Sequence, residues 1–110
     1  MKRADELVPL GVLEEQVLVA VIRTQRDTYG MNVRREIERV TGREVAIGAV
    51  YATLDRLEAK GLLTSRRVAG GDVSRRCFVL TSAGTKALSE TYMMRQRLWE
   101  GIDPRRLGLA

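Results

Sequence analysis

The stretch AIGAVYATLDRLEAKGLL, residues 46–63, decides the fold because it predicts a helix with one apolar face and one nearly bare face. The apolar positions recur at i, i+4 and i+7, the spacing of an amphipathic helix, and they are Val50, Leu54 and Leu57. We expect this helix to span residues 48–60 and to stop at Gly61. Its far side carries small residues where a solvated helix normally shows charges: Gly48, Ala52 and Ala59. Such a face indicates close approach to another surface.

Composition excludes most enzyme chemistry. The 110-residue chain has no histidine and a single cysteine, Cys77, so it cannot build a Cys/His zinc site, a Ser-His-Asp triad or an intramolecular disulfide. No glycine-rich phosphate loop is present, and the carboxylates are expected on exposed helix faces beside basic residues. We therefore expect no catalytic residues, no metal and no cofactor. A formal charge of +5 favours a nucleic-acid partner, because Lys and Arg neutralise phosphates.

No segment predicts a membrane span or a signal peptide. The longest apolar run, residues 17–22, is far shorter than the roughly 20 residues that a span requires. The N-terminal Met-Lys-Arg is soon followed by Asp5 and Glu6. Together with the lone cysteine, these features predict a cytoplasmic protein.

The order of the remaining elements predicts a winged helix. Apolar periodicity indicates a helix over residues 10–25 and a second one around 33–40, which Gly42 follows as the C-cap, although the β-branched run at 17–22 could also form a strand. Two extended runs, residues 62–69 and 74–80, flank Gly70-Gly71-Asp72 and predict a β-hairpin. Thr81 is a good N-cap for a final helix over residues 82–100. The fold class is mainly α with a small β-hairpin (α+β): a winged helix-turn-helix in residues 1–80, then a dimerisation helix and short tail in 81–110.

In a helix-turn-helix, the second helix of the motif enters the major groove of DNA. Small residues let that helix approach closely in a groove ~12 Å wide. Asp55 would repel phosphates there, so we expect it to pair with Arg56 or Arg34, or to accept a hydrogen bond from a base. The expected DNA-binding residues on the helix and the hairpin are Gly48, Ala49, Tyr51, Ala52, Thr53, Arg56, Arg66, Arg67, Arg75 and Arg76.

The sequence resembles the PadR winged-helix transcriptional regulators. The matching segments are GAVYATLDRLE at 48–58, KGLL at 60–63 and LTSAG at 80–84. Two differences stand out: the family often has Pro where this chain has Ala52, and Arg-Arg-Tyr-Tyr-Arg-Leu-Thr where it has RRCFVLT at 75–81. The resemblance implies a dimeric repressor whose recognition helix, including Tyr51, contacts operator DNA.

The last helix carries an apolar stripe that predicts a partner. We expect a two-fold homodimer, with the alternative that the helix folds back on its own core. A dimer sets two recognition helices ~34 Å apart and predicts a pseudo-palindromic operator. The expected dimerisation residues are Leu88, Tyr92, Met94, Leu98 and Trp99.

The family resemblance also implies an aromatic small-molecule effector, with Trp99 and Tyr92 as the expected ligand residues. A tryptophan near a helix end is alternatively an interface anchor. A different function remains open at this point: a winged helix that contacts another protein through Ala52 and Ala59 rather than binding specific DNA. Salt dependence separates the two, because phosphate neutralisation makes affinity fall steeply with salt.

Overall fold

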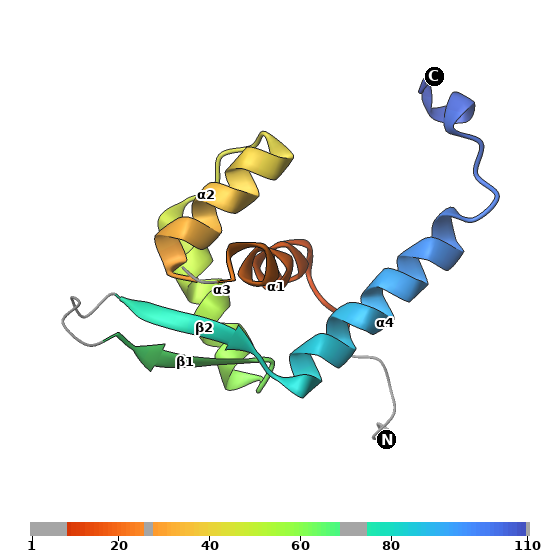
Figure 1. Ribbon diagram of the computed structural model, residues 1–110. Coiled ribbons are helices and arrows are strands. Elements are labelled where there is room, and N and C mark those ends of the chain that lie inside the picture. The colour runs from red at the N-terminus through yellow and green to blue at the C-terminus, as the bar shows by residue number, and fades with distance from the viewer. Residues whose placement is uncertain (1–8, 26–27, 69–74, 110) are drawn as a thin grey trace.

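The computed structural model describes residues 9–25, 28–68 and 75–109, and within them the predicted order of helix, helix, helix, hairpin and helix is confirmed (Figure 1). The elements are α1 (Val12–Thr24), α2 (Gly30–Thr41), α3 (Ile47–Ala59), β1 (Leu63–Arg67), β2 (Arg76–Leu80), α4 (Ser82–Trp99) and a 3-10 turn, η1 (Pro104–Leu107). The expected turn Gly70-Gly71-Asp72 and the first six residues lie outside the described ranges.

The first three helices enclose the core. The helical interpretation of residues 17–22 is confirmed, since all of them lie in α1. Phe78 of β2 is buried beside the helices, and its backbone N–H donates to the hydroxyl of Thr28 at 3.1 Å. The side chains at the centre of the core are fully buried, among them Val17, Leu18, Val33, Val50, Leu54 and Leu57. The inward stripe predicted for α3 is therefore confirmed.

Glycine and threonine set the ends of the helices. Gly42 ends α2 with φ 71°, and Gly61 follows α3 with φ 77°, a left-handed conformation that glycine adopts without a steric penalty. α3 begins at Ile47, one residue earlier than expected. Thr81 caps α4 as predicted, because its hydroxyl accepts a hydrogen bond from the Gly84 N–H at 3.0 Å.

The hairpin is antiparallel and shorter than the two extended runs predicted. Leu63 pairs with Leu80 and Arg67 with Arg76, so the two strands are in register over five residues each. The first residue of β1 and two residues of β2, Cys77 and Phe78, are buried. Thr64, Arg66, Arg67 and Val79 of the two strands are exposed, whereas Ser65, Arg76 and Leu80 are half-buried.

α4 divides into a packed half and a protruding half. Gly84, Ala87 and Thr91 are buried against the body, and a side chain at Gly84 would collide with the backbone carbonyl of Leu62. Leu88, expected on the dimerisation side, packs partly against this chain's own core.

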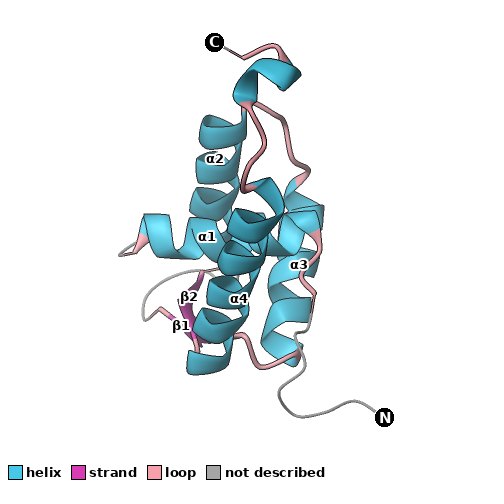
Figure 2. Ribbon diagram, turned by 90° about the vertical axis from the view of Figure 1, so that its right-hand side faces the viewer, coloured by secondary structure: helices cyan, strands magenta, loops and turns pink. Residues whose placement is uncertain are grey.

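Beyond Thr91 most side chains of α4 are exposed, although Arg95 still pairs with Glu15 of α1, and the end of the helix extends from the body as an arm that carries η1 (Figures 1 and 2). The radius of gyration is 15.8 Å, against about 13 Å for a compact chain of this length. No helix in the described part of the chain has the length and apolar character needed to cross a bilayer.

Candidate nucleic-acid interface

The small face of α3 is open to solvent. Gly48, Ala49 and Ala52 are all exposed, and a Cβ added at Gly48 would have no atom within 4 Å beyond its chain neighbours and the backbone of its own helix. Val50 and Leu54 anchor the other side of the same helix in the core. α3 is therefore held firmly on one side and carries almost no side-chain bulk on the other.

Tyr51 lies at the edge of this face, and its ring packs against Gly30 at the start of α2. Its half-buried ring occupies the space that a side chain at Gly30 would need. Gly30 therefore has a packing function, because any larger residue there would displace the Tyr51 ring from its present place.

The expectation for Thr53 is corrected. Its side chain is buried, with 1% exposure, and its hydroxyl donates to the Ala49 carbonyl at 2.8 Å. Position 53 faces the interior together with Val50 and Leu57. Its side chain therefore does not belong to the surface that DNA could meet.

Arg56 is exposed but tethered to α1. Its Nε lies 3.5 Å from a Glu14 carboxylate oxygen. The same carboxylate accepts from Lys60 Nζ at 2.7 Å and from the Gly11 N–H at 2.8 Å. These two hydrogen bonds, the one from Lys60 foremost, hold the pKa of Glu14 below its usual range. The expectation that carboxylates lie on exposed faces is wrong for Glu14, which is only 7% exposed.

Asp55 has a different partner from the two expected. It pairs with Arg76 of β2 at 2.7 Å, whereas Arg56 turns to α1. Consecutive helical residues point about 100° apart, which separates Asp55 from its neighbour. Arg34 donates instead to the Val45 carbonyl at 2.8 Å. Arg76 consequently lies against α3.

The other three hairpin arginines are exposed. Arg66 and Arg67 are exposed on β1, and Arg75 stacks on the Tyr29 ring with 5.2 Å between the guanidinium carbon and the ring centre. The segment 69–74 that joins the two legs lies outside the described residues. The arginines expected to act together are thus divided between an exposed group and one, Arg76, that contacts α3.

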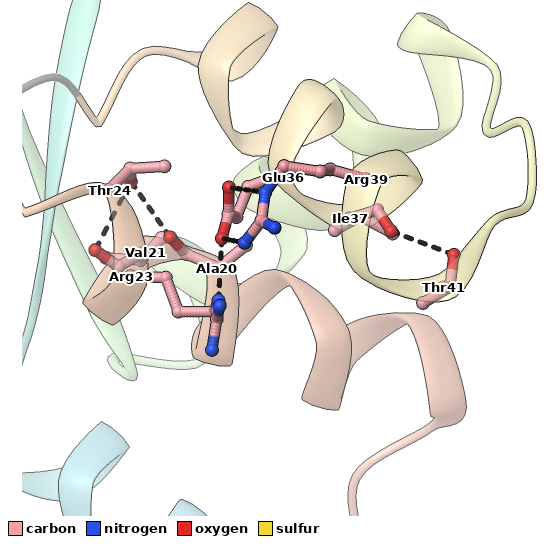
Figure 3. A network of polar contacts seen from close by, with 8 residues as sticks. All are labelled: Ala20, Val21, Arg23, Thr24, Glu36, Ile37, Arg39 and Thr41. Atoms are coloured by element: carbon pink, nitrogen blue, oxygen red, sulfur yellow. Dashed lines mark hydrogen bonds and ion pairs between the residues drawn. The ribbon is translucent and has the colours of Figure 1, made fainter.

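An ion-pair cluster fastens α2 to α1. The Glu36 carboxylate lies between Arg23 of α1, at 2.6 Å, and Arg39 of α2, at 2.7 Å (Figure 3). These two guanidinium groups, Arg39 foremost, lower the pKa of Glu36 to about 2. The cluster adds a polar contact between α2 and α1 to the apolar packing of Val33 and Ile37.

The expected ligand residues do not share a hollow. Tyr92 lines a shallow hollow of about 380 Å³ between α1 and α4, together with Val19 and Ile22. Trp99 lines another near the end of α4, beside Met93 and Arg97. In the described ranges, no group of three His, Cys, Asp or Glu side chains could hold a metal ion.

Residues 17–90 match the family described as the transcriptional regulator PadR-like family. Transcriptional regulator Rv3488 of Mycobacterium tuberculosis is 39% identical over 64 residues, which cover 58% of this chain and 59% of that protein. The match therefore spans less than two thirds of that regulator.

Two solved structures have a similar fold. RosR of H. salinarum has a TM-score of 0.69 at 26% identity and covers 88% of this chain and 84% of its own. F93 from STIV, a winged-helix DNA-binding protein, has a TM-score of 0.70 at 16% identity and covers 86% and 98%. The matched family and the curated relative are transcriptional regulators rather than enzymes.

Proposed function

Because the chain belongs to the PadR-like family of transcriptional regulators, whose members regulate transcription by binding DNA, we propose that it is a sequence-specific, homodimeric repressor. The open face of α3 carries this proposal. A helix anchored by Val50 and Leu54 exposes Gly48, Ala49 and Ala52, so its backbone can approach the base edges of the major groove. A regulator of this kind acts where chromosomal DNA lies, and we place it in the cytoplasm.

Charged and aromatic side chains border the open face and supply the remaining contacts. Tyr51 lies at its edge, and Arg56 extends from the next turns with 53% of its side chain exposed. On the hairpin, the exposed Arg66, Arg67 and Arg75 can follow the adjacent phosphate backbone. In this arrangement α3 reads base edges and the arginines fix its position on the duplex.

The arm of α4 supports a homodimer. Its protruding half exposes large apolar side chains, with 62% exposure at Tyr92, 66% at Leu98 and 55% at Trp99. Val12 and Ile22 of α1 are exposed as well, at 69% and 48%. Covering these side chains with a second copy removes apolar surface from water at ~25 cal/mol per Å². A two-fold dimer then requires a pseudo-palindromic operator with half-sites ~34 Å apart.

We also propose that an aromatic small molecule releases the repressor from DNA by binding near Trp99 and Tyr92. The two residues line separate hollows on the same helix. In the proposed dimer, a ligand in either hollow would change how α4 packs against the second copy. That change would alter the distance between the two α3 helices and weaken their fit to the operator. Trp99 is the single tryptophan, so its emission reports on the site directly. If aromatic acids at millimolar concentration change neither the Trp99 emission nor the affinity for DNA, the proposal of an aromatic effector is contradicted.

The test is fluorescence anisotropy with a duplex from upstream of the protein's own gene and a scrambled duplex, each titrated at several salt concentrations. Tighter binding to the upstream duplex with a steep salt slope supports the proposal. Absence of binding to either duplex at low salt contradicts it, and favours a winged helix that contacts protein through Ala52 and Ala59.

A further inference from the structure

We propose that Arg76 is a positioning residue that neutralises Asp55 on the DNA-facing side of α3 and fixes the hairpin against that helix. This inference rests on the proposed function, because it assumes that α3 enters the groove. It reverses the expectation that Arg76 binds DNA directly. The three remaining hairpin arginines keep that expected function.

The guanidinium of Arg76 contacts other side chains of the protein on several sides. Its Nη2 lies 2.7 Å from Asp55 Oδ1 and its Nη1 lies 3.4 Å from Glu58 Oε1. Its guanidinium also stacks on the Phe78 ring, with 5.1 Å between the guanidinium carbon and the ring centre. Only 28% of the Arg76 side chain is exposed. Both terminal nitrogens and one face of the guanidinium are therefore already engaged.

The same cluster binds the first strand of the hairpin. The Glu58 carboxylate accepts from the Ser65 backbone N–H at 3.1 Å and from the Ser65 hydroxyl at 2.8 Å. Glu58 thus holds β1 through Ser65 and β2 through Arg76. The hairpin is attached to α3 by both of its strands, so the orientation of its exposed arginines follows that of the recognition helix.

Arg76 should strengthen DNA binding by neutralising the charge of Asp55. Asp55 follows Ala52 by three residues on the open side of α3, and 60% of its side chain is exposed. A carboxylate about 7 Å from a phosphate repels it enough in water to weaken binding about threefold. Arg76 supplies the opposite charge within hydrogen-bonding distance and cancels most of this repulsion. Without Arg76, two carboxylates, Asp55 and Glu58, would remain beside the DNA.

A double-mutant cycle distinguishes this function from direct contact. The variants are Arg76→Gln, Asp55→Asn and their combination, with Arg75→Gln, at the residue directly before β2, as the matched control. Binding is measured by anisotropy with the upstream duplex and, at low salt, with a mixed-sequence duplex. Thermal unfolding of each variant verifies that it is folded.

We expect Arg76→Gln to weaken binding about threefold to tenfold, from unpaired Asp55 together with a loosened hairpin. Asp55→Asn alone should change affinity by less than about twofold, because its charge is already neutralised. The double variant should regain the roughly threefold part of the loss that unpaired Asp55 causes, with a wild-type salt slope. Arg75→Gln should instead lower the salt slope by about one and gain nothing from Asp55→Asn.

Two results would overturn the inference in different ways. If Arg76→Gln lowers the salt slope by about one and Asp55→Asn does not rescue it, Arg76 contacts phosphate directly. That result leaves the proposed function intact. If the wild-type protein binds neither duplex, the proposed function fails and this inference fails with it.

Discussion

Replacing Gly48 with leucine should make the fold more stable and its binding to DNA weaker. The two effects have opposite signs because position 48 belongs to α3, yet an added Cβ there would meet no other part of the protein within 4 Å. A change that merely damaged the protein would lower both quantities. The opposite signs therefore test whether the small face serves the fold or a partner.

The magnitudes follow from helix propensity and groove width. Glycine within a helix costs about 0.5–1 kcal/mol relative to a good helix former, so Gly48→Leu should raise the free energy of unfolding by up to that amount. An α-helix with its side chains is ~10–12 Å wide, and the major groove is ~12 Å wide. A leucine on the approaching face leaves no room, and we expect at least about tenfold weaker binding, equivalent to about 1.4 kcal/mol.

Urea unfolding and anisotropy on the same preparation measure the two quantities. Ala59→Leu is the matched control, since Ala59 is exposed at the last residue of α3, seven positions after Ala52. The affinity of Ala59→Leu for DNA should be closer to that of the wild type than the affinity of Gly48→Leu is. Wild-type affinity in Gly48→Leu would refute the reasoning, because the small face would then lie away from the DNA.

Three further variants test the packing, the buried carboxylate and the arm. Gly84→Ala should lower the free energy of unfolding by about 2–3 kcal/mol in urea, because its Cβ would meet a backbone carbonyl that cannot move aside; wild-type stability would show that α4 docks differently. Glu14→Gln should cost about 1–2 kcal/mol at neutral pH. Because the folded-state pKa of Glu14 is lowered, the carboxylate stabilises the fold at pH values above the ordinary pKa of 4.5 and loses this effect as pH falls below it. The free energies of unfolding of the two proteins should therefore become equal in acid. A difference that stays constant with pH would contradict the pairing with Lys60. Leu98→Glu should convert the dimer to a folded monomer in sedimentation velocity, since Leu98 is 66% exposed on the arm; an unchanged dimer would place the interface elsewhere.

The fold could be predicted from the sequence because its signals are local. The stripe of α3, the glycine that ends α2 and the threonine that caps α4 each act within a few residues of their own position. The exposed small face of α3 is also a local feature, since periodicity alone assigns it to the side opposite Val50 and Leu54. These features need no knowledge of distant contacts.

The partners of charged side chains could not be predicted, because they join residues far apart in the chain. Glu14 pairs with Lys60 across 46 positions, and Asp55 pairs with Arg76 across 21. Of the two partners expected for Asp55, the adjacent Arg56 is turned away by helix geometry, and Arg34 donates to the Val45 carbonyl instead. Thr53 was misplaced for a local reason that could have been used: it is three residues after Val50, on the buried stripe.

The central claim is that the small face of α3 lies in the major groove, and dimethyl sulfate protection of a bound operator tests it most directly. Guanine N7 is exposed in the major groove and adenine N3 in the minor groove, so the reagent reports on both. We expect protection of guanine N7 in two tracts whose centres lie ~34 Å apart. Protection confined to adenine N3, or none at guanine N7 in a duplex that the protein binds tightly, would contradict the account.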